Sequence, residues 1–460
     1  MEYGVECMKK WFLSFVLLML VLPLLSGCGE TEAEPVVTTQ QLRIGILSDI
    51  HSNTAPVYDP LERVEKALRF FKEKGVDGIM ITGDLLDSGD AYSIMQLQDV
   101  WLDVFPNNIN DLTGERVEPL FVYGNHDEMM VLDRYWFDGI GSEYEDAWIK
   151  EIKGYQFVGV HYTQENGTLV QKLLSQAQAL SADKPFFFAQ HIPMANTVVG
   201  GYSSYGGHVI PIHDILKKSY NCVVFSGHTH VPITDERSIW QSTSKKDPQF
   251  TAVNCGTMFY GFLKDFCNIE INGDPYRTQQ GIYMVVDGSV VTLERYSLTD
   301  IELTYENGVA SIDSSKAKTI GVPWVFDAMD KKNRPYDYDD RAEAAGKPVF
   351  PEGGQLEITE LTSEGLTLTI PAAQVDAPEG YSDVVQSYYI EIADTASGEV
   401  VQTLEVASSY HIDTEPERLN QPVTTFVRGL EAGKEYTISV CARECYQKSS
   451  DPIVITVTVP

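Results

Sequence analysis

The chain has 460 residues, of which 66 are acidic and 34 are basic, giving a formal net charge of −32. This length predicts two or three domains, each able to bury a hydrophobic core. The summed negative field repels polyanions and so excludes long nucleic acid as an expected partner, whereas a small phosphorylated substrate stays compatible because bound dications reverse the field locally.

An export signal is predicted at residues 1–28. Two lysines precede an apolar run over residues 11–25, and small residues follow it. The run is shorter than the ~20 residues of a membrane span. Leu25-Ser26-Gly27-Cys28 resembles the lipobox of bacterial lipoproteins, which implies a lipidated Cys28 and a membrane anchor on the extracytoplasmic face. Translation then starts at Met1 or Met8, and an ordinary cleaved signal with an incidental cysteine is the alternative.

Residues 29–40 are acidic, rich in threonine and without apolar periodicity, which predicts a flexible tether. Five cysteines follow, and such an odd, scattered set is not a disulfide framework. We therefore expect them to be small apolar residues, including Cys441 and Cys445, which are too far apart to bond in an extended strand.

The first predicted strand, Leu42–Leu47, is followed by Asp49 and His51. If the extended backbone continues, period two places both side chains on one face, pointing to one centre. An aspartate at a strand end is more often a cap of the next helix, so this pair alone establishes nothing. That helix is expected to begin at Pro60 and to end near Gly75.

Two further predicted strands also end in polar side chains. Gly78–Thr82 is followed by Gly83-Asp84-Leu85-Leu86-Asp87, with a helix expected between Tyr92 and Phe105. Leu120–Tyr123 is followed by Gly124-Asn125-His126-Asp127. Each turn taken singly is explained by local hydrogen bonding, but three such strand ends in succession favour a site.

Histidines continue the pattern in the next part of the chain. Strands are predicted at Tyr155–Val160, Phe186–Ala189 and Cys222–Phe225, the second followed by His191 and the third by His228 and His230. Later strand-like segments at residues 250–254, 267–271, 281–287 and 290–296 predict a second sheet or a sandwich, and a helix is expected over residues 169–180. The Gly-rich segment 200–207 is expected to overhang the site. His161 is a candidate supporting residue, His208 and His213 are candidate substrate contacts, and His411 is expected at the surface.

The ordered blocks Asp49-x-His51, Gly83-Asp84-x-x-Asp87, Gly124-Asn125-His126-Asp127, His191 and Gly227-His228-x-His230 resemble the calcineurin-like metallophosphoesterases over about residues 42–297. The resemblance implies a double β-sheet flanked by helices and a dinuclear metal centre. One ion would be held by Asp49, His51 and His230, the other by Asn125, His191 and His228, with Asp84 as the bridge.

The residue types agree with that chemistry. A carboxylate can bridge two ions ~3.5–4 Å apart, and mixed imidazole, carboxylate and amide ligands suit Mn, Fe, Zn or Co. Two dications make a bridging hydroxide available as the nucleophile, and His126, poised by Asp127, is the expected general acid. Asp87 stands where purple acid phosphatases have a tyrosine ligand, which argues against a ferric-tyrosinate centre. Ser88 stands where Ser/Thr protein phosphatases have an arginine, which weakens the protein-phosphatase interpretation.

The last part of the chain changes character. After a catalytic domain at residues 41–298, residues 299–350 are expected to be an irregular connector that packs on it through residues 323–326. Seven short alternating strands then predict an all-β, immunoglobulin-like sandwich at residues 351–460. Leu430-x-x-Gly433-x-x-Tyr436 resembles the tyrosine corner of fibronectin type III domains, although the usual core tryptophan is absent. The expected role of the sandwich is that of a spacer or of a binding module for cell-surface partners.

These observations predict an exported, lipid-anchored phosphoesterase of fold class α/β with a β-sandwich appended. They leave monoesters and diesters, including nucleotides, open as substrates. The alternative from another class is a metal-binding, non-catalytic surface protein whose sandwich binds a partner.

Overall fold

The computed structural model describes residues 41–52, 59–88, 91–127, 140, 145–162, 167–199, 210–242, 249–261, 278–409 and 421–460. Several sequence predictions lie outside these residues: the export signal with Cys28, the tether, the Gly-rich segment 200–207, the strand at 267–271, His208, His411 and the side chain of His213.

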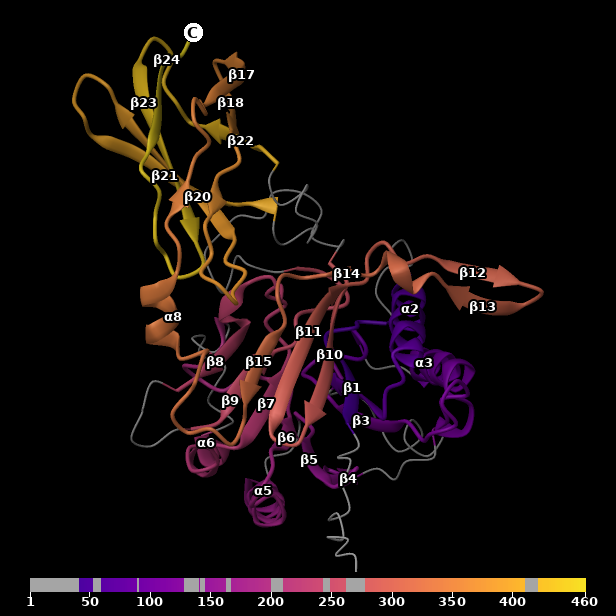
Figure 1. The fold of residues 1–460 in the computed structure, drawn as a ribbon. Helices are drawn as coiled ribbons and strands as arrows, with labels where there is room; N and C mark the ends of the chain where they lie inside the picture. Colours follow the sequence, from indigo (N-terminus) through magenta and orange to yellow (C-terminus); the bar gives the residue numbers. More distant parts are fainter. Residues whose placement is uncertain are drawn as a thin grey trace, which may run out of the picture. The chain divides into compact units, whose positions relative to one another are not determined.

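The first sheet brings together strands from distant parts of the chain (Figure 1). Its order is β14 (Lys318–Thr319), β11 (Val290–Ser297), β10 (Gln280–Asp287), β1 (Leu42–Leu47), β2 (Gly78–Thr82) and β3 (Glu118–Val122), with β15 (Trp324–Asp327) also paired to β11. β1, β2 and β3 are parallel, so their carboxyl ends meet at one edge of the sheet.

The second sheet has the order β4 (Ala147–Ile152), β5 (Tyr155–Val160), β6 (Phe186–Ala189), β7 (Cys222–Ser226), β9 (Thr251–Asn254) and β8 (Ile239–Gln241). Its four central strands, β5, β6, β7 and β9, are parallel. Here too the carboxyl ends of neighbouring strands lie together.

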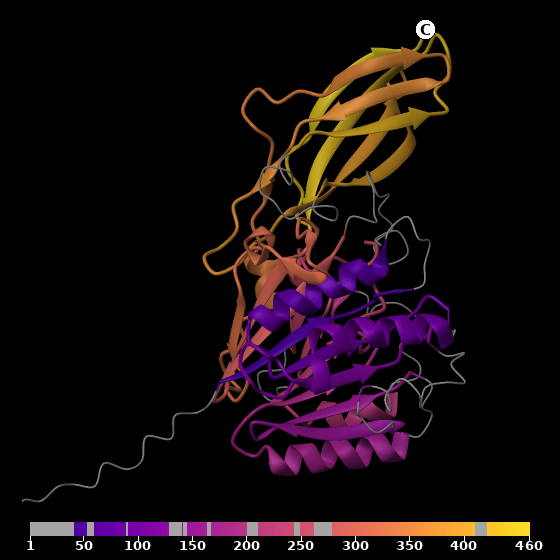
Figure 2. The same ribbon diagram turned by 90° about the vertical axis from the view of Figure 1, so that its right-hand side faces the viewer.

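The two sheets face each other across a shared apolar core. Ile44 and Met80 of the first sheet belong to the same buried cluster as Phe187 and Val223 of the second. On the outer side of the first sheet lie α2 (Pro60–Glu73) and α3 (Ala91–Val104), and on that of the second lie α5 (Gly167–Leu180) and α6 (Ile210–Leu216). Figure 2 shows this order of layers, helix, sheet, sheet, helix, which confirms the predicted double sheet flanked by helices.

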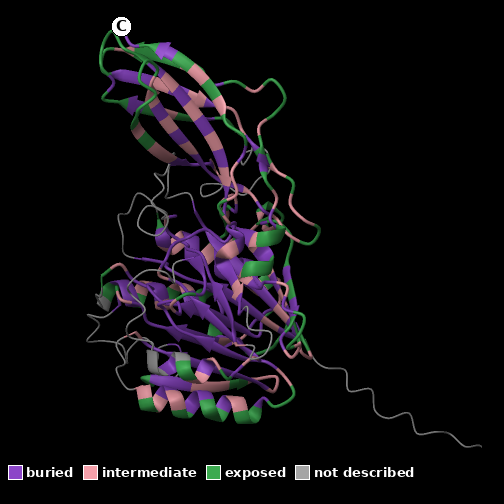
Figure 3. Cartoon of the chain, turned by 90° about the vertical axis from the view of Figure 1, so that its left-hand side faces the viewer, coloured by how far each residue is buried: buried purple, intermediate pink, exposed green. Residues whose placement is uncertain are grey.

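The helices α2, α3 and α5 form where the sequence predicts them, whereas α6 is not predicted. In α2, Pro60 occupies the first turn, the Asp59 carboxylate accepts a hydrogen bond from the Glu62 amide (3.1 Å), and Val64, Leu68 and Phe71 are buried. Burial follows the layers, so the strands of both sheets are largely buried while α5 carries exposed residues on its outer side (Figure 3).

Residues 299–350 are not the irregular connector that their polar sequence predicts. They contain the hairpin β12 (Leu303–Glu306) and β13 (Val309–Ile312), the helix α8 (Tyr338–Ala344) and, with β14 and β15, further strands of the first sheet. Trp324 is fully buried, as the predicted packing of residues 323–326 requires, and its indole N–H donates to Glu236 at 3.2 Å. Short 3-10 turns complete the domain at Pro106–Asn108, Glu236–Ser238 and Ser314–Lys316.

The C-terminal region contains the seven predicted strands, in two sheets. β17 (Glu357–Thr362), β18 (Gly365–Ile370) and β22 (Val423–Arg428) form one, and β21 (Val400–Ala407), β20 (Val385–Asp394), β23 (Glu435–Glu444) and β24 (Ile453–Thr458) form the other. Both contribute to one buried apolar cluster. A further pair, β16 (Pro348–Val349) and β19 (Gln374–Val375), lies outside these two sheets.

Four described cysteines, Cys222, Cys255, Cys441 and Cys445, carry free thiols, as the sequence predicts. Among the helices of the described ranges, none combines the length and the apolar character that a membrane crossing needs.

Candidate metal centre

The site lies where strand ends from both sheets meet. Asp49 and His51 follow β1, Asp84 follows β2, and Asn125 and His126 follow β3. The second sheet contributes His191 after β6 and the pair His228 and His230 after β7. A backbone hydrogen bond from Gly227 to the His191 carbonyl (2.9 Å) joins the two loops of the second sheet.

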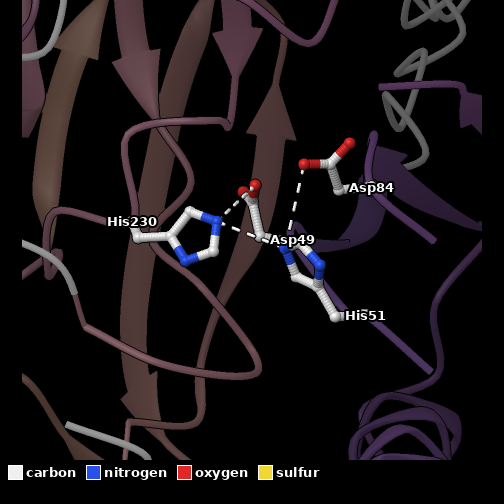
Figure 4. Close-up of side chains that lie close together, drawn as sticks. All are labelled: Asp49, His51, Asp84 and His230. Atoms are coloured by element: carbon white, nitrogen blue, oxygen red, sulfur yellow. Dashed lines mark hydrogen bonds and ion pairs between the residues drawn. The ribbon is translucent and has the colours of Figure 1, made fainter. Parts of the chain in front are cut away.

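One cluster of four side chains is fully buried (Figure 4). His230 Nε2 lies 3.1 Å from Asp49 Oδ1, and His51 Nε2 lies 3.8 Å from Asp84 Oδ2. The Nε2 atoms of His51 and His230 lie 3.3 Å from each other. Two carboxylates and two imidazoles thus direct their ligand atoms to one point, as a metal ion requires.

A second cluster shares Asp84 with the first. His191 Nε2 lies 3.2 Å from Asp84 Oδ2 and 3.0 Å from Asn125 Oδ1. His228 Nδ1 lies 3.3 Å from the same His191 nitrogen. The structure therefore brings together all seven predicted ligands in two groups, with Asp84 common to both.

The donor set fits metal ions because the outward ring nitrogens already have partners. The Nδ1–H of His191 donates to the Thr82 carbonyl (2.8 Å), and that of His230 donates to the Tyr260 carbonyl (3.0 Å). The Nδ1–H of His51 donates to the Asp87 carboxylate (3.1 Å). When these rings are neutral, the bonds leave the lone pair of each Nε2 facing the centre. Lone pairs only 3.3 Å apart repel unless a cation lies between them.

The electrostatics of the site also demand positive charge. Burial raises the pKa of Asp49 and of Asp84, but attraction to His230 and to His191, respectively, outweighs it, so both pKa values are lowered. Burial lowers the pKa of His191, yet Asp84 and Asp49 raise it to about 9. Burial and His191 lower the pKa of His228 to about 4. The two carboxylates therefore favour positive charge at the centre, which a metal ion would supply.

Backbone conformation, rather than strand periodicity, aims the paired ligands. Asp49 and His51 have φ of 52° and 50°, and His228 and His230 have φ of 70° and 52°. Asp84 is left-handed as well, with φ of 51°. The expectation that an extended strand continues through Asp49 and His51 is therefore wrong, because the chain turns there. Left-handed non-glycine residues are uncommon and gather at functional sites.

Glycines let these turns approach closely. A Cβ on Gly124 would lie 2.1 Å from Asp84 Oδ1, and one on Gly227 would lie 1.9 Å from Ser48 Oγ and 2.5 Å from Asp49 Oδ2. Only glycine fits against these candidate ligand carboxylates. The Asp49 carboxylate uses the room to accept the His228 amide at 3.0 Å.

His126 lies beside the clusters, with its side chain 39% exposed. Its Nδ1–H donates to the Asp87 carbonyl at 2.8 Å, and the Asp87 carboxylate lies 3.6 Å from the same nitrogen. Its backbone amide donates to Asp84 Oδ1 at 3.0 Å. The ring is therefore oriented by Asp87 and leaves Nε2 as the nitrogen that can deliver a proton.

The sequence predicts that Asp127 orients His126, but in the structure Asp127 contacts other groups. Its buried carboxylate accepts hydrogen bonds from the amides of Gly124 (2.8 Å), Leu86 (2.9 Å) and Leu85 (3.2 Å), and burial raises its pKa to about 7. It ties the turn after β3 to the turn after β2. Its contribution to the site is to hold the backbone on which Asp84 and His126 lie.

The segment after β9 also supports the site, although its sequence does not indicate this. The Met258 amide donates to the Ser48 carbonyl (3.0 Å), and the Tyr260 carbonyl holds His230. The buried Arg63 of α2 donates to the Phe259 carbonyl at 2.8 Å. These contacts use backbone atoms, which leave no signature in the sequence beyond a glycine turn after an apolar strand.

His161 is buried at the end of β5, away from the two clusters. Its Nδ1 accepts the Tyr123 amide at 2.9 Å, so it supports the end of β3 rather than a metal ligand. Burial lowers its pKa to about 3.

Residues 42–232, which include all five sequence blocks, match the model of the calcineurin-like phosphoesterase family. This segment is therefore a calcineurin-like phosphoesterase domain, as the sequence predicts. No curated protein matches the chain.

Solved structures that resemble the chain include a dimetal phosphatase from Danio rerio, at 9% identity and a TM-score of 0.38, covering 56% of this chain and 96% of that one. A purple acid phosphatase from yellow lupin (Lupinus luteus) seeds matches at 14% identity and a TM-score of 0.38, covering 57% of this chain and 52% of that one. Vacuolar Protein Sorting 29 from Cryptosporidium parvum matches at 11% identity and a TM-score of 0.30, covering 62% and 98%, respectively.

Proposed function

We propose that the protein is a metal-dependent phosphoesterase that hydrolyses phosphate mono- or diesters. The observation that carries this proposal is the pair of buried ligand clusters that share Asp84, within a segment that matches the calcineurin-like phosphoesterase family. A single structural ion would need neither the shared carboxylate nor the adjacent, half-exposed His126.

The ligand set assigns each ion its residues. Asp49, His51 and His230 would hold one, Asn125, His191 and His228 the other, with Asp84 between them. Such a set suits Mn, Fe, Zn or Co. When bound, the pair of ions would neutralise phosphoryl charge and make hydroxide available as a nucleophile at neutral pH.

The protein's own residues then provide the proton. The leaving alcohol needs one as its bond to phosphorus breaks, and His126 lies next to the ligands without belonging to either cluster around Asp84. Asp87 holds the His126 ring through its carbonyl at 2.8 Å and its carboxylate at 3.6 Å. We assign His126 as the general acid and Asp87 as its positioning residue.

The direct test is hydrolysis of p-nitrophenyl phosphate and bis(p-nitrophenyl) phosphate by the purified protein loaded with Mn or Zn. We expect turnover of at least one ester, loss of turnover on treatment with a chelator, and recovery on adding the metal back. Tight binding of two ions without turnover of either ester would favour the non-catalytic, metal-binding alternative.

We propose that the C-terminal sheets form a fibronectin type III-like sandwich that binds a partner at the cell surface. Three-stranded and four-stranded sheets around one core support this, as does the Tyr436 hydroxyl, which accepts the Glu431 amide at 3.0 Å in the manner of a tyrosine corner. The region contributes no residue to the two ligand clusters.

We propose lipid anchoring through Cys28, for which the lipobox-like sequence is the support. Cys28→Ala expressed in a bacterial host is expected to move the protein from the membrane fraction to the soluble extracytoplasmic fraction or the medium. Fractionation with immunodetection measures this, and Cys222→Ala, at a buried thiol, is the matched control. Retention of the Cys28 variant in the membrane fraction would contradict the anchor.

A further inference from the structure

The metal centre has a buried floor and a partly exposed rim. The ligands Asp49, His51, Asp84, His191 and His230 are each at most 4% exposed. Five residues in contact with them are partly or fully exposed, namely Asp87, Asn125, His126, His228 and Tyr260. Among the described residues, a substrate that reaches the metals meets this rim, and whatever part of it is not phosphate lies against these side chains.

Tyr260 is the aromatic member of that rim besides the imidazoles. Its ring centroid lies 4.2 Å from that of His230 and 6.0 Å from that of His51. The His51 ring in turn lies 4.9 Å from the His126 ring. The proposed general acid and the tyrosine ring therefore flank the same ligand, so an alcohol group that takes its proton from His126 can reach Tyr260.

The backbone that carries the ring is held in this position. The Tyr260 carbonyl accepts His230 Nδ1–H at 3.0 Å, and the carbonyl of Phe259, next to it, accepts Arg63 at 2.8 Å. A partly exposed tyrosine ring on a held backbone provides a stacking surface at low entropic cost, because only two side-chain torsions are left to order when a second ring binds.

The charges on the rim disfavour an anionic group beyond the phosphate. Asp87 contributes a carboxylate there, and the whole chain has a formal charge of −32. A neutral, planar group suits this surface better than a second phosphate or an acidic peptide.

We propose that Tyr260 is a specificity-determining residue on which an aromatic ring of the substrate's alcohol group stacks, so that the preferred esters are those of aryl or nucleoside alcohols. This inference rests on the proposed phosphoesterase function. Tyr260 thus has two distinct roles: its backbone carbonyl positions a metal ligand, and its ring selects the substrate.

Pairs of substrates with the same type of leaving oxygen test the ring alone. Adenosine 5′-monophosphate is compared with ribose 5-phosphate, and benzyl phosphate with cyclohexylmethyl phosphate, together with the methyl diesters of all four. We expect the wild type to have the higher kcat/KM for the member with the aromatic ring, chiefly through KM. The first pair reports a nucleoside preference and the second an aryl preference.

Tyr260→Leu is expected to lower this preference by roughly 5- to 100-fold, the range that loss of one base–aromatic stack produces. Tyr260→Phe keeps the ring and should keep the preference. Tyr305→Leu, at a tyrosine 66% exposed on the β12–β13 hairpin, is the matched control. Equal losses for both members of a pair, or loss of bound metal in Tyr260→Leu, would overturn the assignment, because either result means that the ring is only structural.

Calorimetric titration separates this inference from the proposed function. Zn-loaded protein is titrated with adenosine 5′-monophosphate and with ribose 5-phosphate, with no requirement for turnover. Tighter binding of the nucleotide that depends on the Tyr260 ring would support the inference even if no ester is hydrolysed. Equal affinities in the wild type would overturn it even if hydrolysis is efficient.

Discussion

Replacing Asp84 with asparagine is expected to lower kcat/KM for phosphate esters by roughly 10³-fold or more and to release at least one metal ion. Several kcal/mol of metal-derived stabilisation corresponds to such a factor. Asp84 is the residue common to both ligand clusters, with Oδ2 3.8 Å from His51 and 3.2 Å from His191. Asparagine keeps the shape of the side chain but removes its negative charge and replaces one of the two oxygens with an NH2 group. Such a neutral amide cannot bridge two cations.

The measurement combines metal content by mass spectrometry with steady-state kinetics at saturating Mn or Zn. Asp77→Asn is the matched control, since Asp77 is also buried and precedes β2, whereas Asp84 follows it. Asp77 pairs with Lys153 at 2.7 Å, so its loss should affect stability and leave the metals in place. Two bound ions and undiminished turnover in Asp84→Asn would contradict a dinuclear site.

His126→Ala is expected to retain both metal ions and to lose about 10²–10⁴-fold in rate on esters with poor leaving groups. The loss should be much smaller for p-nitrophenyl esters, because p-nitrophenolate leaves without a proton. The side chain is 39% exposed, so its removal should leave the fold intact. This contrast between leaving groups distinguishes an acid from a residue that only binds phosphate.

Steady-state kinetics on benzyl phosphate and p-nitrophenyl phosphate would measure this difference in rate loss between the two leaving groups. Metal content would be determined in parallel. Asp87→Asn is the informative companion variant. Its carbonyl still holds the His126 ring at 2.8 Å, so a partial loss in the same direction is expected. If His126→Ala sheds metal, or slows both esters alike, the residue is not the acid.

Much of the site could be predicted because its ligands follow apolar, β-branched strands and are chemically distinct. Asp49 and Asp84 follow such strands and His191 follows the wholly apolar β6, and parallel pairing within each sheet brings neighbouring strand ends together. The seven C-terminal strands could be predicted for a similar reason, since their alternation is regular.

Other features carry no such signal. β4 reads Ala-Trp-Ile-Lys-Glu-Ile and is too charged to be distinguished from a loop, and β14 and β15 are only two and four residues long. The role of Asp127 depends on which amides it meets in the fold. The same holds for Tyr260, whose carbonyl acts on His230 irrespective of the side chain.

The left-handed backbone at five of the proposed metal ligands has an evolutionary consequence. Glycine at Asp49, His51, Asp84, His228 or His230 would relieve a conformational cost of order 1 kcal/mol at each position and would destroy the site. Selection for stability alone would therefore replace these residues, whereas selection for hydrolysis retains them. A library of variants sorted only for thermal tolerance should become enriched in glycine at these five positions, and a library sorted for turnover should become depleted of it.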